Sequence, residues 1–180
     1  MNPIEHLNQS ASKAHAQPEE ILAAINLQAG ESILEIGIGG GWYAERFAQA
    51  VGANGHYHGM DVNPEFVAHI KTLSATYPHM DAEVVAAGEL PQTELRFDRI
   101  FSRNTYHHLH ERSRWFAQMR RFLKEKGELL LIDFNQAHGS HNQPHHYTLE
   151  KTLLEEMQAA GFVLKRQHDF LYRQLFMVFQ

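Results

Sequence analysis

The sequence predicts an α/β protein built on a doubly wound, mainly parallel sheet. Short apolar runs alternate with longer segments whose apolar residues recur at helical spacing, and glycine and proline separate these segments. The chain has 180 residues, of which 43% are hydrophobic, which is enough for one domain with its own core. We therefore expect residues 1–180 to form a single domain, in which residues 1–17 are a polar leader or a lid.

Seven apolar runs are expected to form the strands. The run at 128–134 is the most continuously apolar, as expected for the buried centre of a parallel sheet. The last two runs are joined by only a few residues, too few for a parallel crossover, so this pair should be antiparallel. The expected strands are residues 32–37, 56–61, 82–87, 97–102, 128–134, 163–170 and 174–180.

The expected helices have recognisable starts or ends. Pro18, followed by two glutamates, opens the first helix, which ends before Gly30. Asn63 is an N-cap followed by proline at the first helical position. Gly127 closes the fourth helix, and Thr148 is a plausible N-cap of the last. The expected helices cover residues 18–29, 42–51, 64–77 and 111–126, and run from Thr148 to about Gly161.

The composition argues against several classes of function. There is no cysteine, which excludes disulfides, thiolate zinc sites and cysteine nucleophiles. With 16 basic and 21 acidic residues the formal net charge is −5, and no basic cluster suggests a nucleic-acid partner. No apolar run approaches the roughly 20 residues that span a bilayer, and the start does not resemble a signal peptide. We expect a cytoplasmic protein with no membrane partner; the oligomeric state is not indicated.

The segment with the clearest chemical signal is the glycine loop after the first expected strand. Glycines at 37, 39, 40 and 41 allow positive φ angles and let a ligand approach the main chain closely. In a doubly wound sheet this loop lies at the carboxyl ends of the strands, where ligands bind. A dinucleotide fingerprint would require glycine at position 42, but Trp42 stands there, which disfavours an NAD-dependent enzyme.

Glu35, Gly37, Gly39 and Gly41 have the spacing E-x-G-x-G-x-G, which resembles small, bacterial-type class I S-adenosylmethionine-dependent methyltransferases. Asp61 follows twenty residues after Gly41, as the family's second motif would place it. Further segments that resemble the family are 59–64, 87–91, 97–109 and 122–133. The resemblance covers about residues 18–180 and implies S-adenosylmethionine as cofactor. It also implies a Rossmann-like doubly wound seven-stranded sheet of order 3-2-1-4-5-7-6, with strand 7 antiparallel.

The resemblance implies a set of cofactor contacts. Asp61 would accept hydrogen bonds from the ribose hydroxyls, and Val62 would pack on the adenine. Asn104 would contact the methionine end or cap its turn. The family often has an acidic residue after strand three, but alanines stand there, so Glu89 or a backbone contact would replace it. The expected cofactor-binding residues are Glu35, Gly37, Ile38, Gly39, Gly41, Asp61, Val62, Glu89 and Asn104.

Two adjacent histidines, His107 and His108, are the candidate catalytic residues. They follow the fourth expected strand, where an acceptor would approach the methyl group, and a neutral imidazole there could accept a proton. A packing role is the alternative, because this pair is frequent in the family whatever the acceptor. Four further histidines, at 138, 141, 145 and 146, fall in one expected loop, which we interpret as polar rather than as a metal site.

We expect an S-adenosylmethionine-dependent methyltransferase with an unidentified acceptor. A small molecule is favoured, because about 180 residues offer little surface for a folded macromolecule. The alternative is a protein that binds S-adenosylmethionine or S-adenosylhomocysteine without transferring a methyl group.

Overall fold

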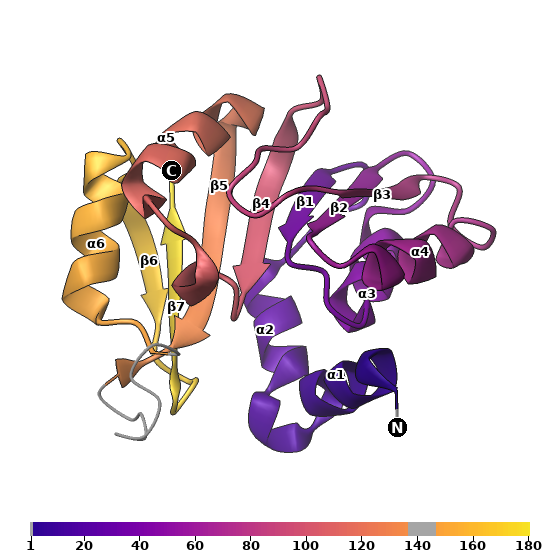
Figure 1. The fold of residues 1–180 in the computed structure, drawn as a ribbon, viewed down its shortest axis with the longest axis horizontal. Helices are drawn as coiled ribbons and strands as arrows, with labels where there is room; N and C mark the ends of the chain where they lie inside the picture. Colours follow the sequence, from indigo (N-terminus) through magenta and orange to yellow (C-terminus); the bar gives the residue numbers. More distant parts are fainter. Residues whose placement is uncertain (1, 137–146) are drawn as a thin grey trace.

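The computed structural model describes residues 2–136 and 147–180, which form one seven-stranded sheet. The strand order is β3-β2-β1-β4-β5-β7-β6, as expected (Figure 1). β7 pairs antiparallel with both β5 and β6, and the other pairs are parallel. The strands are β1 (Ser32–Ile36), β2 (His56–Asp61), β3 (Met80–Val84), β4 (Phe97–Arg103), β5 (Leu123–Phe134), β6 (Leu164–His168) and β7 (Gln174–Phe179).

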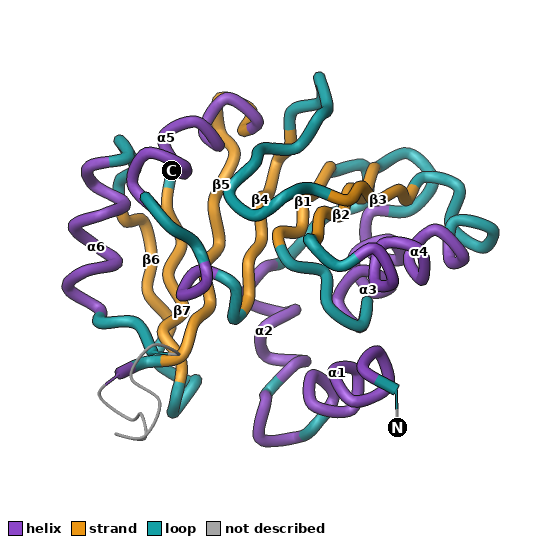
Figure 2. The backbone as a smooth tube through the Cα atoms, viewed as in Figure 1, coloured by secondary structure: helices purple, strands orange, loops and turns teal. Residues whose placement is uncertain are grey.

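Helices cover both faces of the sheet, as Figure 2 shows. β5 is apolar on both faces, and each face packs against helices. Leu129 and Leu131 pack with α5 and α6 on one face, whereas Leu130 and Ile132 pack with α2, α3 and α4 on the other. The α-helices are α1 (Pro3–Ser12), α2 (Pro18–Ile25), α3 (Trp42–Val51), α4 (Pro64–Leu73), α5 (Arg112–Met119) and α6 (Glu150–Ala159), with short 3₁₀ turns η1 (Ala14–Ala16), η2 (Tyr106–His108) and η3 (Arg120–Phe122). Among the described residues, no helix combines the length and apolar character that crossing a membrane requires.

The prediction that a helix runs to Gly127 is wrong. The helix ends at Met119, and Gly127 lies inside β5, where a register shift separates the pairing of Leu123 from that of Glu128. A Cβ at position 127 would lie 2.9 Å from the Phe97 carbonyl oxygen, so glycine is needed here for close approach of the backbone and not as a helix cap.

Other element boundaries also differ from the expected ones. β3 covers residues 80–84 and not 82–87, because its partner β2 ends at Asp61, which pairs with Val84. The first helix stops at Ile25, where Asn26 adopts a positive φ and its N–H closes the last turn. The helix after Asn63 ends at Leu73, before the expected position.

The prediction that Thr148 caps the last helix is also wrong. The N-cap is Leu149, which makes no side-chain cap, and the Thr148 hydroxyl donates to Asp133 Oδ2 at 2.8 Å. Asp133 is fully buried at the end of β5, and it also accepts from the N–H groups of His107 and Phe134, both at 2.9 Å. Its second oxygen lies 2.7 Å from His107 Nδ1. One carboxylate thus connects the end of β5 with η2, which follows β4, and with Thr148, which precedes α6.

We expect Asp133→Ala to lower the free energy of unfolding by about 3–5 kcal/mol, because several buried donors would lose their acceptor together. Thr148→Val removes one of these donors and should cost only about 1 kcal/mol. Urea unfolding followed by circular dichroism measures both values. Equal losses in the two variants would contradict a central role for the carboxylate.

Candidate active site

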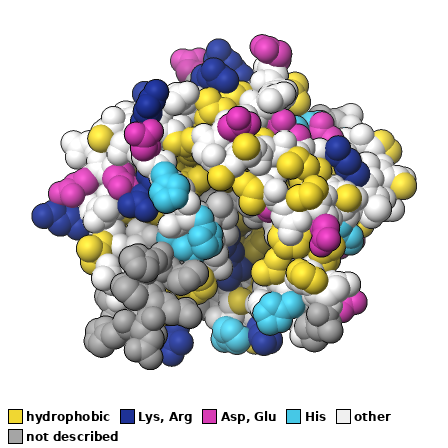
Figure 3. Space-filling view, in the orientation of Figure 1, with side chains coloured by type: hydrophobic (Ala, Val, Ile, Leu, Met, Phe, Trp, Pro, Cys, Tyr) yellow, Lys and Arg dark blue, Asp and Glu magenta, His cyan; other side chains and the backbone are white. Residues whose placement is uncertain are grey.

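A cavity of about 1070 Å³ opens at the carboxyl ends of the central strands. Its walls come from α1, η1, the loop after β1, the ends of β2 and β4, and the connection between β6 and β7. Figure 3 shows a hollow near the centre of this face, with hydrophobic side chains and several histidines around it. This is the edge of the sheet at which doubly wound proteins bind ligands.

The glycine loop has the backbone that its sequence predicts. Gly37, Gly39 and Gly41 have φ angles of 77°, 51° and 87°, in the left-handed region. A Cβ on Gly37 would collide with the Thr105 side chain, whereas one on Gly39 would meet only Leu7 Cδ1, at 3.5 Å. Gly37 therefore serves the packing of the loop on the chain after β4, and Gly39 leaves main chain accessible in the cavity wall.

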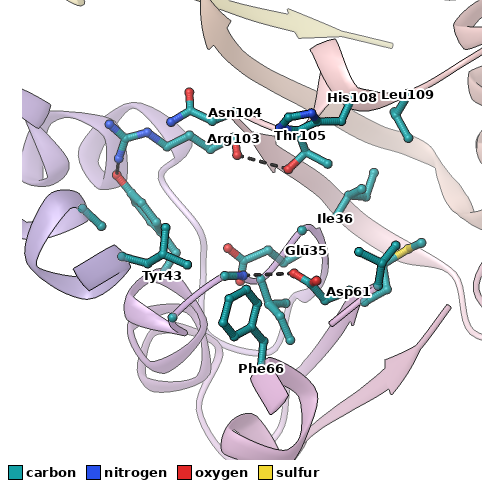
Figure 4. A pocket seen from close by; sticks show the side chains of 18 of the residues that line it. Glu35, Ile36, Tyr43, Asp61, Phe66, Arg103, Asn104, Thr105, His108 and Leu109 are labelled. Atoms are coloured by element: carbon teal, nitrogen blue, oxygen red, sulfur yellow. Dashed lines mark hydrogen bonds between the residues drawn. The ribbon is translucent and has the colours of Figure 1, made fainter. Parts of the chain in front are cut away.

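Asp61 lies at the end of β2 and lines the cavity beside this loop (Figure 4). Its Oδ2 accepts from the Gly39 N–H at 3.2 Å and its Oδ1 from the Asn63 N–H at 2.9 Å. A carboxylate has about four acceptor positions, so each oxygen can still accept a bond from a ligand. Val62, the next residue, is 59% exposed although it is apolar, and it also lines the cavity.

Glu35 lines the cavity but is only 3% exposed. Its Oε2 accepts from the Tyr57 hydroxyl at 2.7 Å. Burial, with a smaller contribution from the nearby Asp61, raises the pKa of Glu35 to about 8, and the bond from Tyr57 opposes this shift only in part. The carboxyl group is therefore mainly neutral at pH 7, unless a cation lies beside it.

Ile38, Glu89 and Asn104 also reach the cavity, in different ways. Gly41 does not: it is buried, and a Cβ at this position would lie 2.6 Å from Ile70 Cδ1. Ile38 is buried in its wall, and the exposed Glu89 lies at its rim. The Glu89 carbonyl accepts from Trp115 Nε1 at 3.2 Å, which fixes the backbone of that loop. Asn104 has a φ of 57°, and its side-chain oxygen accepts from the Gln174 amide, so part of its capacity is used to hold β7.

The two candidate catalytic histidines have different positions. His108 is exposed and lines the cavity. The side chain of His107 is 4% exposed, does not line the cavity, and lies against Asp133. Their ring centroids are 4.0 Å apart. Of these two histidines, the structure thus brings only His108 to the cavity. The His107 ring packs against the His108 ring and is itself bonded to Asp133.

Arg103, at the end of β4, is a cavity residue that sequence reasoning missed. Its guanidinium donates to the Tyr43 hydroxyl, to the Ala16 carbonyl at 3.2 Å and to Gln174 Oε1 at 3.1 Å. Its buried Nε makes no hydrogen bond, and its three acceptors in residues 2–136 and 147–180 are all neutral groups. Burial lowers the pKa of Arg103, yet an arginine stays charged. The only signal in the sequence is a charged residue at the end of an apolar strand.

The cavity therefore has two chemically different sides. In Figure 4, Glu35 and Asp61 lie on one side, and Arg103, Asn104 and His108 lie on the other. The acidic side suits hydroxyl groups or a cation, and Arg103 suits an anionic group.

The polar leader contains a helix that the sequence analysis did not expect. Asn2 and Glu5 form a capping box around Pro3, which begins α1. α1 packs beside α3, and its Leu7 lies over Gly39. His15 lines the cavity, as do Trp42 and Tyr43. The histidines at 138, 141, 145 and 146 lie outside the described residues.

Comparison with known proteins supports the same family. Residues 33–127, more than half of the chain, match the family model described as a methyltransferase domain. Phosphoethanolamine N-methyltransferase 1 of Triticum aestivum is 27% identical over 125 residues, which cover 68% of this chain and 24% of that protein. The chain spans less than two fifths of the length of the curated relatives that it matches.

Two solved structures have the same fold. A SAM-dependent methyltransferase from Aquifex aeolicus is 22% identical, with a TM-score of 0.79 over 98% of this chain and 95% of that chain. The [4+2]-cyclase SpnF is 24% identical, with a TM-score of 0.72 over 89% of this chain and 61% of that chain. The family match and the strand order together show that this chain belongs to the methyltransferase domain family, within the class I S-adenosylmethionine-dependent methyltransferases.

Proposed function

We propose that this protein is an S-adenosylmethionine-dependent methyltransferase that acts on a small-molecule acceptor. The observation that carries the proposal is the position of Asp61, whose carboxylate lies in the cavity wall beside Gly39. A carboxylate at the end of the second strand can accept hydrogen bonds from both vicinal hydroxyls of a ribose. S-adenosylmethionine is the cofactor of the family to which the chain belongs.

The residues around the cavity fit this cofactor. Asp61 would hold the ribose and the exposed Val62 would pack on the adenine, with Ile38 beneath and Glu89 at the rim. The main chain at Gly37 and Gly39 and the side chains of Glu35 and Asn104, all of which line the cavity, would hold the methionine end. When bound, S-adenosylmethionine supplies a methyl group on a sulfonium that is already activated for displacement.

The task left to the protein is to position an acceptor in line with that methyl group. His108 is the cavity residue that we propose as a proton acceptor for an acceptor molecule that arrives protonated. His107, bonded to Asp133, would position it through the contact between their rings. Arg103 would bind an acidic group in the same cavity.

Two observations support a small acceptor. Ligand pockets usually measure about 300–1,000 Å³, and a cavity of about 1070 Å³ can hold a cofactor together with a second small molecule. The wheat relative is named for the methylation of phosphoethanolamine, which is a small amine. A cytoplasmic location and the lack of a nucleic-acid partner stay predictions from the sequence.

The second candidate is a protein that binds the cofactor without methyl transfer. One comparison favours it, because a structure with this fold is named as a [4+2]-cyclase, so the fold does not determine the reaction. Calorimetric titration with S-adenosylmethionine, S-adenosylhomocysteine and NAD tests the binding that both candidates share. An acceptor screen with a labelled methyl donor then separates them: turnover supports the enzyme, and binding without turnover supports the second candidate.

We expect Asp61→Ala to weaken S-adenosylmethionine binding by about 100-fold or more, because each hydrogen bond to a charged group is worth about 1.5–3 kcal/mol. Calorimetry measures the dissociation constant. Asp169→Ala, at an exposed position in the connection between β6 and β7, is the matched control and should bind normally. An unchanged affinity in Asp61→Ala would refute the assignment of the ribose site.

We expect S-adenosylmethionine to bind more tightly as the pH rises from 6 towards 8. Glu35 is protonated below its pKa of about 8, and a cation beside it favours the carboxylate, so binding releases a proton. Titration in two buffers of different ionisation enthalpy counts the released protons at pH 7. Glu35→Gln should release almost none, and proton release equal to that of the unaltered protein would show that another group is responsible.

We expect His108→Ala to lower methyl transfer by about 10²–10⁴-fold with an acceptor that needs a base, and to leave cofactor affinity unchanged. Initial rates and calorimetry on the same preparation separate these effects. His107→Ala should instead lower the free energy of unfolding, because the buried Asp133 loses the bond to the His107 ring and keeps only the main-chain bond from residue 107. Full activity in His108→Ala would return this residue to a structural role.

A further inference from the structure

A second cluster of polar side chains lies on β2 and β3, outside the cavity. His56 and His58 are two residues apart on β2 and therefore point to the same face of the sheet. Asp81 of β3 pairs directly with His58 in the parallel register. One nitrogen of each histidine and one oxygen of Asp81 lie within 4.8 Å of one another. None of the three residues lines the cavity.

Two ligands of a tetrahedral ion with bonds of about 2.0–2.2 Å lie about 3.3–3.6 Å apart. The distance from His56 to Asp81 is in this range, whereas His58 now makes a hydrogen bond to Asp81 that a bound ion would replace. His58 Nδ1 is 2.6 Å and His56 Nε2 is 3.4 Å from the same oxygen of Asp81. His56 Nε2 is buried, and in the described part of the chain its contact with Asp81 does not have the geometry of a hydrogen bond. Metal–nitrogen and metal–oxygen bonds are about 2.0–2.2 Å long, and small movements of these side chains would allow an ion to sit between the three atoms.

Glu83 contacts the other ring nitrogen of His58. Its Oε1 lies 2.8 Å from His58 Nε2, on the side of the ring opposite to Asp81. The Gln92 N–H donates to both Glu83 oxygens, at 2.9 and 3.1 Å, and fixes the carboxylate. A histidine that binds a metal through one nitrogen commonly donates its other N–H to a carboxylate, which fixes the tautomer and the ring. With its proton on Nε2 and donated to Glu83, His58 would present the lone pair of Nδ1 to an ion that replaces the present hydrogen bond to Asp81.

We propose that His56 Nε2, His58 Nδ1 and Asp81 Oδ1 bind a divalent transition metal ion of the Zn²⁺ type, with Glu83 as the positioning residue. Two imidazoles and one carboxylate favour zinc, nickel, copper or cobalt over magnesium and calcium, which prefer oxygen ligands. Asp81 has a side chain that is 56% exposed, so water can complete the coordination. The ion would cross-link β2 to the edge strand β3, away from the cavity.

The test is titration of the EDTA-treated chain of 180 residues with Zn²⁺ by calorimetry, and with Co²⁺ by visible absorption. We expect one ion per chain at this site, with the d–d bands of a Co²⁺ ion bound to nitrogen and oxygen. The double variant His56→Gln/Asp81→Asn should bind at least about 100-fold more weakly and lose these bands. Glu83→Gln should weaken binding about 10–100-fold and keep the bands, because it leaves all three ligands in place.

The matched control is His6→Gln/Asp169→Asn, which removes one exposed histidine and one exposed aspartate elsewhere and should bind as the unaltered protein does. His56→Gln alone, at a side chain that is 31% exposed, should fold normally and already weaken binding. Absence of a bound ion in the unaltered protein would overturn the proposal. Equal affinity in the double variant would also overturn it, because the ion would then lie elsewhere, for example at the histidines in 138–146.

Discussion

The geometry of the candidate site depends on one buried carboxylate, that of Asp133. It lies at the end of the central strand β5 and accepts hydrogen bonds from Thr148 and from the main chain of His107 and Phe134, while it also contacts the His107 ring. A fully buried carboxylate is unfavourable unless its acceptor positions are filled. The segments that fill them are therefore fixed relative to one another, and His108 follows from one of these segments.

The charges in the cavity follow from how deeply each group is buried. Asp61 is half-buried and its oxygens accept main-chain bonds, whereas Glu35 is nearly inaccessible and is held mainly neutral near pH 7. Arg103 keeps its charge and has only neutral partners among the described residues. A ligand with both a positive and a negative group would suit this arrangement. Its positive group beside Glu35 would favour the carboxylate form, and its negative group would pair with Arg103.

The glycine loop and the antiparallel final pair could be predicted from local patterns, namely glycine spacing and a short final connection. The full strand order was implied by the resemblance to a known family, and the structure confirms it. The sequence did not predict the start of β5, since Gly127 looks like a helix cap and its real constraint is the Phe97 carbonyl on another strand. The role of Thr148 likewise depends on Asp133, a partner fifteen residues away. The roles of His107 and Arg103 needed the three-dimensional arrangement. In contrast, the helix in the leader had a local signal, Asn2 with Glu5, that was overlooked.

The contact of α1 with the glycine loop has a consequence for how the sequence can vary. A Cβ on Gly40 would lie 2.6 Å from the Ile4 carbonyl oxygen and would collide with the Asn8 side chain. A larger residue at 40 can therefore be accepted only if the chain near 4–8 moves or carries a smaller side chain. Positions 8 and 40 should consequently co-vary among homologues that keep this helix, and position 40 should vary freely in those that lack it.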